Sequence, residues 1–327
     1  MERTFAGMQK LPHRTSILLF ALALASCTQK AEVEPQAQPK DESHTSFPSA
    51  ESAVEGLVAA VEAHDVAALE KIFGPGGESL VQWGDPVAEN QDRARFLEMY
   101  RAKHELVDGR DGQKVLQVGA NDWPLPAPLV DKDGHWSFSG VEGVDELVYR
   151  RVGRNELGAI RVAHGFVDAQ YEYASKRRDG KIAGLFAPYL ISDPGLHNGL
   201  YWPTERDEAP SPAGPFVAAA AAEGYRKAAA GEPTPYHGYF YRMLYAQGAD
   251  APGGAMDYFE DGQIVRGFAL LAWPSEYGVS GVKTFIVNQD DIVYEKDLGD
   301  DTATAVNDIR IFNPDETWDQ VRVEADQ

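Results

Sequence analysis

The chain has 327 residues, 43% of them hydrophobic, and carries a formal net charge of −21. Because domains average ~100–200 residues, this length predicts two hydrophobic cores. The acidic balance predicts no nucleic-acid partner, since phosphate recognition needs a surface rich in Lys and Arg. The single cysteine, Cys27, excludes an intrachain disulfide and the cysteine-rich zinc sites, and the sequence predicts no metal and no cofactor.

Residues 1–27 have the pattern of a lipoprotein signal peptide. A basic start precedes an apolar run over residues 17–24, which is shorter than the ~20 residues of a membrane-spanning helix. The run ends in Leu24-Ala25-Ser26-Cys27, which resembles the bacterial lipobox, whose cysteine receives a lipid. The alternative is an ordinary secretory signal with an incidental cysteine. Because Thr28 rather than Asp follows, the resemblance to Gram-negative lipoproteins implies anchoring in the outer membrane, facing the periplasm, through the lipid on Cys27.

Composition divides the rest of the chain. Residues 28–46 are rich in Pro, Gln, Glu, Ala and Ser and contain almost no large apolar residue, which predicts a disordered tether. Residues 47–143 are predicted to form an N-terminal α+β domain. Residues 144–327 are predicted to form a C-terminal domain in which a long helix packs against a small antiparallel sheet. The expected fold class is therefore α+β.

The N-terminal domain is predicted to start with two short helices. Ser49 precedes apolar residues at a spacing of three to four, and His64-Asp65 interrupts this pattern. A further helix over residues 90–105 and strands over residues 115–118 and 135–138 follow. This order of small helices, a Gly-rich turn and strands resembles the front of an NTF2-like (cystatin-like) domain.

The segment Asp131-Lys132-Asp133-Gly134 allows two interpretations. One is the start of an EF-hand calcium loop, which Glu142 would close. His135 and Trp136 argue against it, because an oxygen ligand and a Gly are needed at those two positions. An Asp-Gly hairpin turn between two strands is the favoured prediction.

The C-terminal domain is predicted to begin with a helix over residues 155–178, with Asn155 as its N-cap and three basic residues in its last turn. Short runs rich in aromatic and β-branched residues then predict antiparallel strands. The runs cover residues 236–245, 267–274, 282–287 and 292–296, and residues 288–291 are predicted to form the hairpin loop between the last two. A long helix followed by a small sheet also resembles the layout of pilins, without their membrane-spanning half.

Six motifs stand in an order that resembles the bacterial family catalogued as domain of unknown function 2950. They are Phe166–Ala174, Gly199–Pro203, Pro235–Tyr239, Ala251–Ala255, Gly267–Val279 and Thr284–Asn288. The resemblance covers nearly everything after Phe47. It implies a secreted or lipid-anchored envelope protein of Gram-negative bacteria, and it implies no particular activity.

No catalytic residue is predicted. The sequence contains no Gly-x-Ser-x-Gly elbow, His-Glu-x-x-His motif, phosphate loop or dinucleotide fingerprint. The favoured function is therefore a non-catalytic binding or interaction module of the cell envelope, with an envelope protein or a cell-wall component as its partner. The alternative is a periplasmic hydrolase, or an enzyme that binds a small ligand or glycan, with its site near Tyr201, His237 and Trp273.

Aromatic residues beside Gly and Pro at the ends of predicted elements indicate one concave binding patch. Its predicted members are His197, Tyr201, Trp202, Tyr236, His237, Trp273, Glu276 and Tyr277. The alternative places the Tyr and Trp side chains in the core, with hydrogen-bonded tips, and the histidines in loops.

Overall fold

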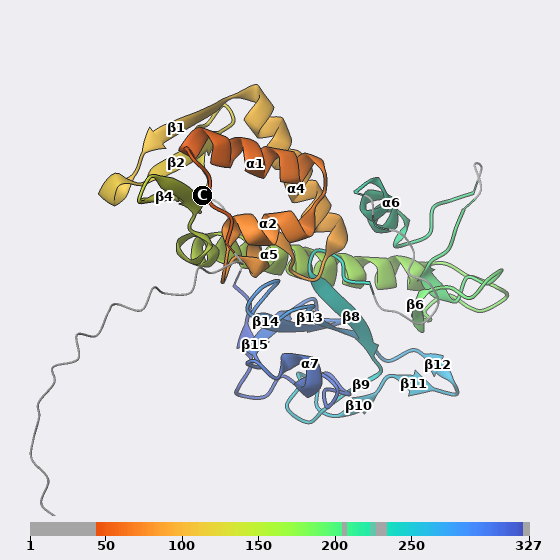
Figure 1. Ribbon diagram of the computed structural model, residues 1–327. Helices are drawn as coiled ribbons and strands as arrows, with labels where there is room; N and C mark the ends of the chain where they lie inside the picture. The colour runs from red at the N-terminus through yellow and green to blue at the C-terminus, as the bar shows by residue number, and fades with distance from the viewer. Residues whose placement is uncertain (1–43, 205–207, 224, 226–233, 323–327) are drawn as a thin grey trace, which may run out of the picture. The chain divides into compact units, whose positions relative to one another are not determined.

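The computed structural model describes residues 44–204, 208–223, 225 and 234–322, which Figure 1 draws as a coloured ribbon. They belong to one compact unit, Asp41–Gln327, and contain seven α-helices and several antiparallel sheets. The predicted α+β class is confirmed. The predicted signal peptide, its lipidation site Cys27 and residues 28–43 of the predicted tether lie outside the described residues.

The folded part begins before the predicted tether ends. His44 Nε2 lies 3.0 Å from the carbonyl oxygen of Phe138, and the Thr45 N–H donates to the carbonyl of Lys71 at 2.8 Å. These bonds fasten residues 44 and 45, the end of the predicted tether, to the fold. Composition did not reveal them because they use a His ring and a backbone N–H rather than large apolar side chains.

Four helices form the start of the described chain. They are α1 (Ala50–Glu62), α2 (Val66–Phe73), α3 (Glu78–Val81) and α4 (Pro86–Ala102). The predicted pair of short helices is confirmed: Ser49 caps α1 and Asp65 caps α2, each by accepting a backbone N–H of the first turn. Helix α4 begins at Pro86 rather than at residue 90, because Asp85 caps it and proline fits the first helical position.

A sheet of five short strands follows. The strands are β1 (His104–Asp108), β2 (Lys114–Val118), β3 (Trp123–Pro124), β4 (Leu129–Lys132) and β5 (His135–Phe138), with the single-turn helix η1 (Arg110–Gly112) between the first two. Their order is β1-β2-β4-β5, and β3 also pairs with β2. The turn between β4 and β5 has Asp133 and Gly134 at φ angles of 57° and 79°, and Asp131 accepts the Gly134 N–H at 2.9 Å. The predicted Asp-Gly hairpin is confirmed.

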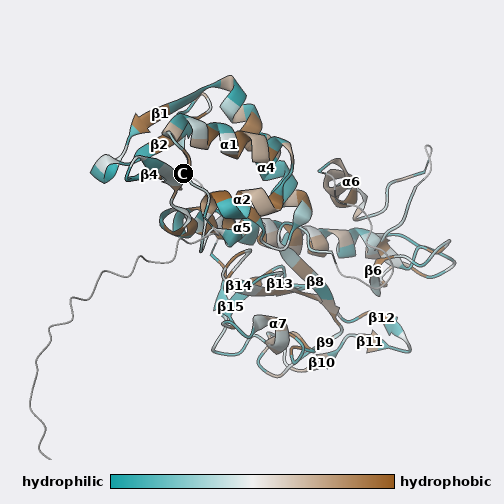
Figure 2. Ribbon diagram, viewed as in Figure 1, coloured by the Kyte–Doolittle hydropathy of each residue, from teal (hydrophilic) through white to brown (hydrophobic). Residues whose placement is uncertain are grey.

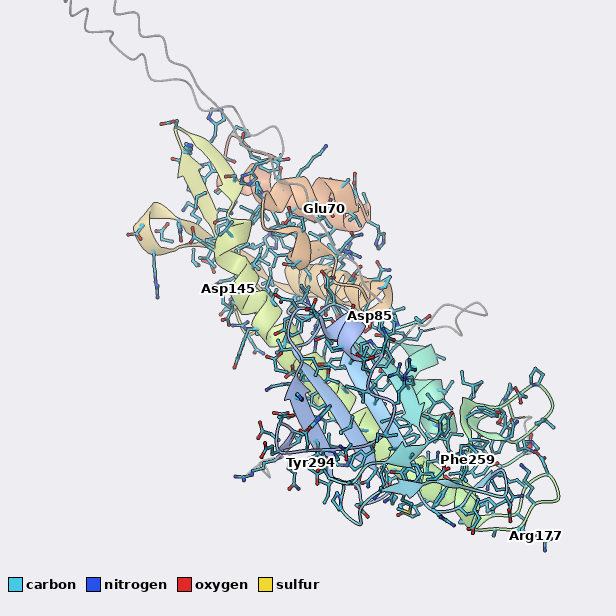
Figure 3. The ribbon with its side chains drawn as sticks, turned by 90° about the horizontal axis from the view of Figure 1, so that it is seen from below. Glu70, Asp85, Asp145, Arg177, Phe259 and Tyr294 are labelled. Atoms are coloured by element: carbon cyan, nitrogen blue, oxygen red, sulfur yellow. The ribbon has the colours of Figure 1, made fainter. Side chains whose placement is uncertain are left out.

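Helix α5 (Gly140–Ser175) has 36 residues, which corresponds to ~54 Å at 1.5 Å per residue. Figure 3 labels Asp145 near its beginning and Arg177 just beyond its end. The predicted helix over residues 155–178 is its second half. Asn155 is not an N-cap: it is buried inside the helix, and its Nδ2 donates to the Ser280 carbonyl at 2.9 Å.

The first half of α5 was not predicted because its glycines weaken the helical pattern of the sequence. Three of them lie between residues 140 and 153, and glycine weakens a helical pattern. At Gly143 the packing requires it, because a Cβ there would lie 2.7 Å from the backbone of Ala127. The missing side chain lets the start of α5 approach the segment before β4 closely.

Five strands form the second sheet, in the order β16-β15-β14-β13-β8. They are β8 (Tyr239–Leu244), β13 (Ala269–Pro274), β14 (Lys283–Asn288), β15 (Val293–Asp297) and β16 (Asp319–Gln320). Each neighbouring pair is antiparallel, and the first four strands match the four predicted runs. The loop predicted over residues 288–291 joins β14 to β15, with Asp291 at a φ of 58°.

The two faces of this sheet pack on different elements. Along β13, Leu270 belongs to the hydrophobic cluster that contains Phe166 of α5. Its neighbours Ala269 and Leu271 belong to a second cluster, with Val306 at the end of the short helix α7 (Thr302–Ala305). Figure 2 accordingly colours β13 toward the hydrophobic end of the scale. A strand that is buried on both faces is apolar along its whole length.

Smaller elements complete the described chain. They are β6 (Tyr189–Ile191), β7 (Gly199–Tyr201), α6 (Gly214–Ala222), β9 (Ala246–Gln247), β10 (Met256–Asp257), β11 (Phe259–Glu260) and β12 (Gln263–Ile264). The long helix on a small antiparallel sheet is the predicted layout, whereas the finer likenesses to NTF2-like and pilin folds are not confirmed.

The hydrophobic clusters bear on the predicted division into domains. One cluster lies within residues 50–138, and the other two lie within residues 159–312. The boundary predicted between residues 143 and 144 falls near the start of α5, a helix that contacts both α3 and the second sheet. The division into two domains stays a prediction.

Phe285 of β14 tests the core of the second sheet. Its side chain is 1% exposed, and its ring lies 5.8 Å from that of Tyr239. Phe285→Ala is expected to lower the free energy of unfolding of residues 41–327 by ~3–5 kcal/mol, because it removes buried apolar surface and leaves a cavity. Urea denaturation measures this change. The control is Phe259→Ala, at a side chain that is 37% exposed, which should cost less than ~1 kcal/mol. Equal costs would place β14 at the surface.

Candidate functional site

His197 and Trp202 form one group just after α5. Their rings are 4.7 Å apart, and His197 Nδ1 lies 2.8 Å from Asp179 Oδ1. The backbone N–H of His197 also donates to Asp179 at 2.7 Å, and this bond is the main cause of the lowered pKa of the Asp179 carboxyl. The guanidinium of Arg178 lies 5.5 Å from the centre of the Trp202 ring, and Tyr201 ends β7. Because Trp202 is buried, this group fastens the turn after α5.

Tyr236, His237 and Glu276 form a second group near the start of β8. The rings of Tyr236 and His237 are 4.1 Å apart, and the residue before Glu276 donates its N–H to the Gly238 carbonyl at 2.9 Å. Burial lowers the pKa of the His237 imidazole, while Glu223, 3.4 Å from its Nε2, acts in the opposite direction. Burial is the larger effect, so the fold favours a neutral His237.

Trp273 and Tyr277 lie apart from both groups. Trp273 packs on the face that α7 covers, and the Tyr277 hydroxyl donates to Asp297 at 2.9 Å. Within the described ranges, no hydrogen bond, ion pair or ring contact joins Trp273 to Trp202 or to His237. No direct contact among the described residues therefore joins the two groups to Trp273, and the single patch stays a prediction. Alternate side chains of a strand point to opposite faces, which separates Trp273 from the cluster that contains Trp202.

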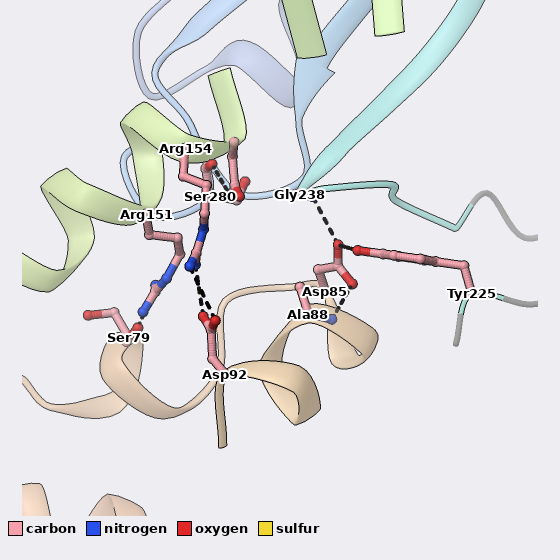
Figure 4. A network of polar contacts seen from close by, with 10 residues as sticks. Ser79, Asp85, Ala88, Asp92, Arg151, Arg154, Tyr225, Gly238 and Ser280 are labelled. Carbon is pink, nitrogen blue, oxygen red and sulfur yellow. Dashed lines mark hydrogen bonds and ion pairs between the residues drawn. The ribbon is translucent and has the colours of Figure 1, made fainter. Parts of the chain in front are cut away.

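Asp85 is the centre of a polar network that the sequence does not predict (Figure 4). Its side chain is 1% exposed. It accepts the Tyr225 hydroxyl at 2.7 Å, the Gly238 N–H at 2.9 Å and the N–H of Ala88, in the first turn of α4, at 3.1 Å. Burial, and then the bond to Asp85, raises the pKa of the Tyr225 phenol, so this hydroxyl remains a donor. The carboxylate thus joins α4 to the start of β8.

Metal binding and hydrolysis depend on how the His, Asp, Glu and Ser side chains of the described residues are arranged. Within residues 44–204, 208–223, 225 and 234–322, no group of three His, Asp or Glu side chains is arranged to hold a metal ion. Ser280 lies in a segment near the spacing of a hydrolase elbow, but its Oγ donates to the Glu276 carbonyl at 3.0 Å. Ser280 is therefore a turn residue.

A cavity of about 600 Å³ lies among the helices of the first half of the chain. Its apolar lining comes mainly from the first four helices, β2 and α5, and includes Leu57, Val61, Leu69, Phe73, Leu80, Val81, Phe96, Met99, Val118, Leu125 and Leu147. Small-molecule sites have volumes of ~300–1,000 Å³ and mostly apolar walls. The volume and the lining both fit such a site.

The charged groups of this cavity come from two helices. Helix α4 contributes Glu89, Asp92, Arg93 and Arg95, and α5 contributes Arg150, Arg151 and Arg154. Five arginines thus accompany two carboxylates, in a chain whose net charge is −21. Figure 4 shows Arg151 and Arg154 extending from α5 toward the segment that carries Ser79 and Asp92. The charged end of the cavity therefore lies where α4 and α5 face each other.

Arg151 is the most buried of these arginines, with 6% of its surface exposed. Its Nη1 donates to the Ser79 carbonyl at 2.7 Å, and its guanidinium lies 4.8 Å from the centre of the Trp83 ring. No carboxylate of the described chain lies within ion-pair distance of it. Burial is the main cause that lowers the pKa of Arg151 to about 10, so the group is still charged at neutral pH. One carbonyl leaves most of its five N–H donors for another partner.

The sequence model of one protein family matches residues 44–321. The family is described as "Protein of unknown function (DUF2950)". The chain belongs to this family. No curated protein and no solved structure matches it. The DUF2950 match begins at His44, the residue whose ring contacts the Phe138 carbonyl, and it includes both the Asp85 network and the cavity.

The cavity of this DUF2950 protein was missed by sequence analysis, although part of its signal is present. Three arginines fall within residues 150–154 of a strongly acidic chain, and helical spacing puts Arg150 and Arg154 on one face. The rest of the lining could not be found in this way. It comes from elements far apart in the chain, and no local spacing relates them.

Asp85→Asn tests whether the polar network joins α4 to β8. An asparagine NH₂ group cannot accept hydrogen bonds, so at least one buried donor loses its partner. We expect the free energy of unfolding of residues 41–327 to fall by ~1–3 kcal/mol in urea denaturation, and Tyr225→Phe to cost about 1 kcal/mol. Asp111→Asn is the matched control, because Asp111 is exposed and its φ of 49° suits Asn equally well. A cost for Asp85→Asn no larger than that of the control would contradict the assigned role.

Proposed function

We propose that this protein is a non-catalytic binding protein of the cell envelope, held at the outer membrane by a lipid on Cys27. Its binding site is the cavity lined by α1, α2, α4 and α5. The ligand is a small molecule of the envelope, because the volume and the lining of the cavity fit one.

The cavity is the observation that supports a binding function. Protein interiors are packed densely, and voids much larger than a water molecule are few. A cavity of about 600 Å³ leaves apolar side chains without packing partners, which lowers stability. A ligand that fills the space restores those contacts. The arginines at one end supply the polar groups that orient a ligand in such a site.

The motif at residues 24–27 supports the lipid anchor. Cys27 is the one cysteine of the chain, and it follows Leu24-Ala25-Ser26 at the position that lipidation requires. Among the described residues, no helix is both long enough and apolar enough to cross a membrane.

We do not propose the alternative function, a hydrolase with its site near Tyr201, His237 and Trp273. In the part of the chain that the structure describes, these three side chains share no hydrogen bond, ion pair or ring contact. Catalysis needs its groups within hydrogen-bond reach of a common point.

The anchor is tested by Cys27→Ala in cells, followed by separation of membranes and soluble fractions. Because the lipid is attached to the cysteine sulfur, the variant should leave the membrane fraction or accumulate as an uncleaved precursor. Ser26→Ala is the matched control, since it keeps a small residue before the cysteine, and it should stay with the membranes. A processed Cys27→Ala protein that still sediments with membranes would contradict the proposal.

The binding function is tested by native mass spectrometry of the full chain purified from envelopes. A bound small molecule should add a defined mass to the protein. Ala120 is exposed and lines the cavity, so Ala120→Trp should obstruct the opening and remove the added mass. Ala303→Trp places the same substitution at an exposed position of α7, away from the cavity, and should retain the mass. The same spectrum for all three proteins, with nothing bound, would refute the binding function.

A further inference from the structure

We infer that the ligand of the cavity is a single-chain amphiphile with an anionic headgroup, such as a fatty acid or an alkyl phosphate monoester. Its hydrocarbon chain lies among the apolar side chains of α1, α2 and α4, and its headgroup meets Arg95 and Arg151. The inference rests on the proposed binding function and names the chemical class that the site selects.

The inner walls of the cavity favour a hydrocarbon. Leu57, Val61 and Leu69 are 2%, 5% and 3% exposed, and α4 adds Phe96 and Met99 to the same lining. None of these side chains replaces the hydrogen bonds that a sugar or peptide makes with water, so burying such a ligand against them is unfavourable. An alkyl chain gains free energy from the same surface because it leaves water.

The charged end carries more positive charge than its own carboxylates neutralise. One oxygen of Glu89 accepts two backbone N–H groups, at 2.8 and 3.1 Å. Asp92 is paired with Arg154 at 2.8 Å. In the described part of the chain, Arg95 has no polar partner. Arg93 is paired with Glu89 at 3.7 Å, and Arg150 is paired with Glu146 at 2.6 Å. Among the described residues, Arg95 and Arg151 are therefore the arginines of the lining that have no carboxylate partner, and an anion can neutralise them.

Of the two arginines without a carboxylate partner, Arg151 is buried and Arg95 is exposed. Within the described residues the one hydrogen bond of Arg151 goes to the Ser79 carbonyl, and a buried cation that lacks an anion is unfavourable. A carboxylate or phosphate in the cavity forms short, charge-assisted hydrogen bonds with a guanidinium, often two at once. The same burial that lowers the pKa of Arg151 strengthens such a bond, because a hydrogen bond is electrostatically stronger in surroundings less polar than water.

The apolar part of the inference is tested by calorimetric titration of residues 41–327 with saturated fatty acids of increasing length. Each added methylene should tighten Kd about fourfold, the equivalent of ~0.8 kcal/mol per buried CH₂, until the cavity is filled. A Kd that does not depend on chain length would overturn the inference, because the chain would then lie outside the apolar lining.

The headgroup is tested at constant chain length. The fatty acid and the alkyl phosphate should both bind, and the tighter of the two identifies the source as a free fatty acid or a phosphate-bearing lipid. The primary alcohol has the same chain without charge and should bind at least tenfold more weakly. Equal affinities for the acid and the alcohol would overturn the role of the arginines.

Charge variants locate the headgroup. Arg151→Gln should weaken the fatty acid about tenfold and leave the alcohol within about twofold. Arg95→Gln, at an exposed side chain, should weaken the acid about threefold and keeps the test valid if the buried variant does not fold. Arg110→Gln is the matched control, since Arg110 is exposed in η1 and does not line the cavity. Unchanged affinity in both cavity variants would contradict the inference.

The inference and the proposed function fail in different ways. Native mass spectra that show a bound molecule other than an anionic amphiphile, together with no binding of fatty acid or alkyl phosphate, would refute the ligand class and leave the binding function intact. Spectra with no bound molecule, and titrations with no heat of binding for any amphiphile, would refute both.

Discussion

Arg151 and Asn155 lie one turn apart on the buried face of α5, and the structure depends on the hydrogen bonds that these two side chains donate. Arg151 donates to the Ser79 carbonyl in α3, and Asn155 donates to the Ser280 carbonyl between β13 and β14. Buried polar groups need such partners. Rotating α5 or shifting it along its axis would break the two bonds, so they fix its position against both parts of the chain. One helix therefore contacts the first helices with its beginning and the second sheet with the turns that follow.

The side chains that α5 packs against the first helices shape the cavity. Where an apolar side chain would complete a core, the helix carries Arg151. Apolar residues of similar size are commonly at least as stabilising at such a place, so the buried Arg151 lowers stability unless an anion compensates it. Arg150 and Arg154 are exposed and paired with Glu146 and Asp92. Asp85 holds α4, the opposite wall, to the start of β8 through its bond with Gly238. An anionic amphiphile accounts for the charged end and the apolar end of the lining together.

Local chemistry was predictable, and long-range partners were not. The Ser49 cap, the Asp133-Gly134 turn and the four strands follow from neighbouring residues, and the structure contains them. Asn155 suggested a helix start because an amide caps its own helix as readily as it bonds a distant carbonyl. Trp273 suggested a shared patch because its sequence does not say which face of β13 packs on α5. The bond from Asp85 to Gly238 joins residues 153 positions apart, and no spacing rule relates them.

A crystal structure of residues 41–327 with a fatty acid that carries bromine on its terminal carbon tests the account most directly, because anomalous scattering locates the bromine and the density locates the headgroup. The account predicts bromine among the side chains of Leu57, Leu69 and Phe96, with the carboxylate within hydrogen-bond distance of the Arg151 guanidinium. A bromine site outside the cavity, or a carboxylate in solvent with Arg151 still bonded only to the Ser79 carbonyl, would contradict it.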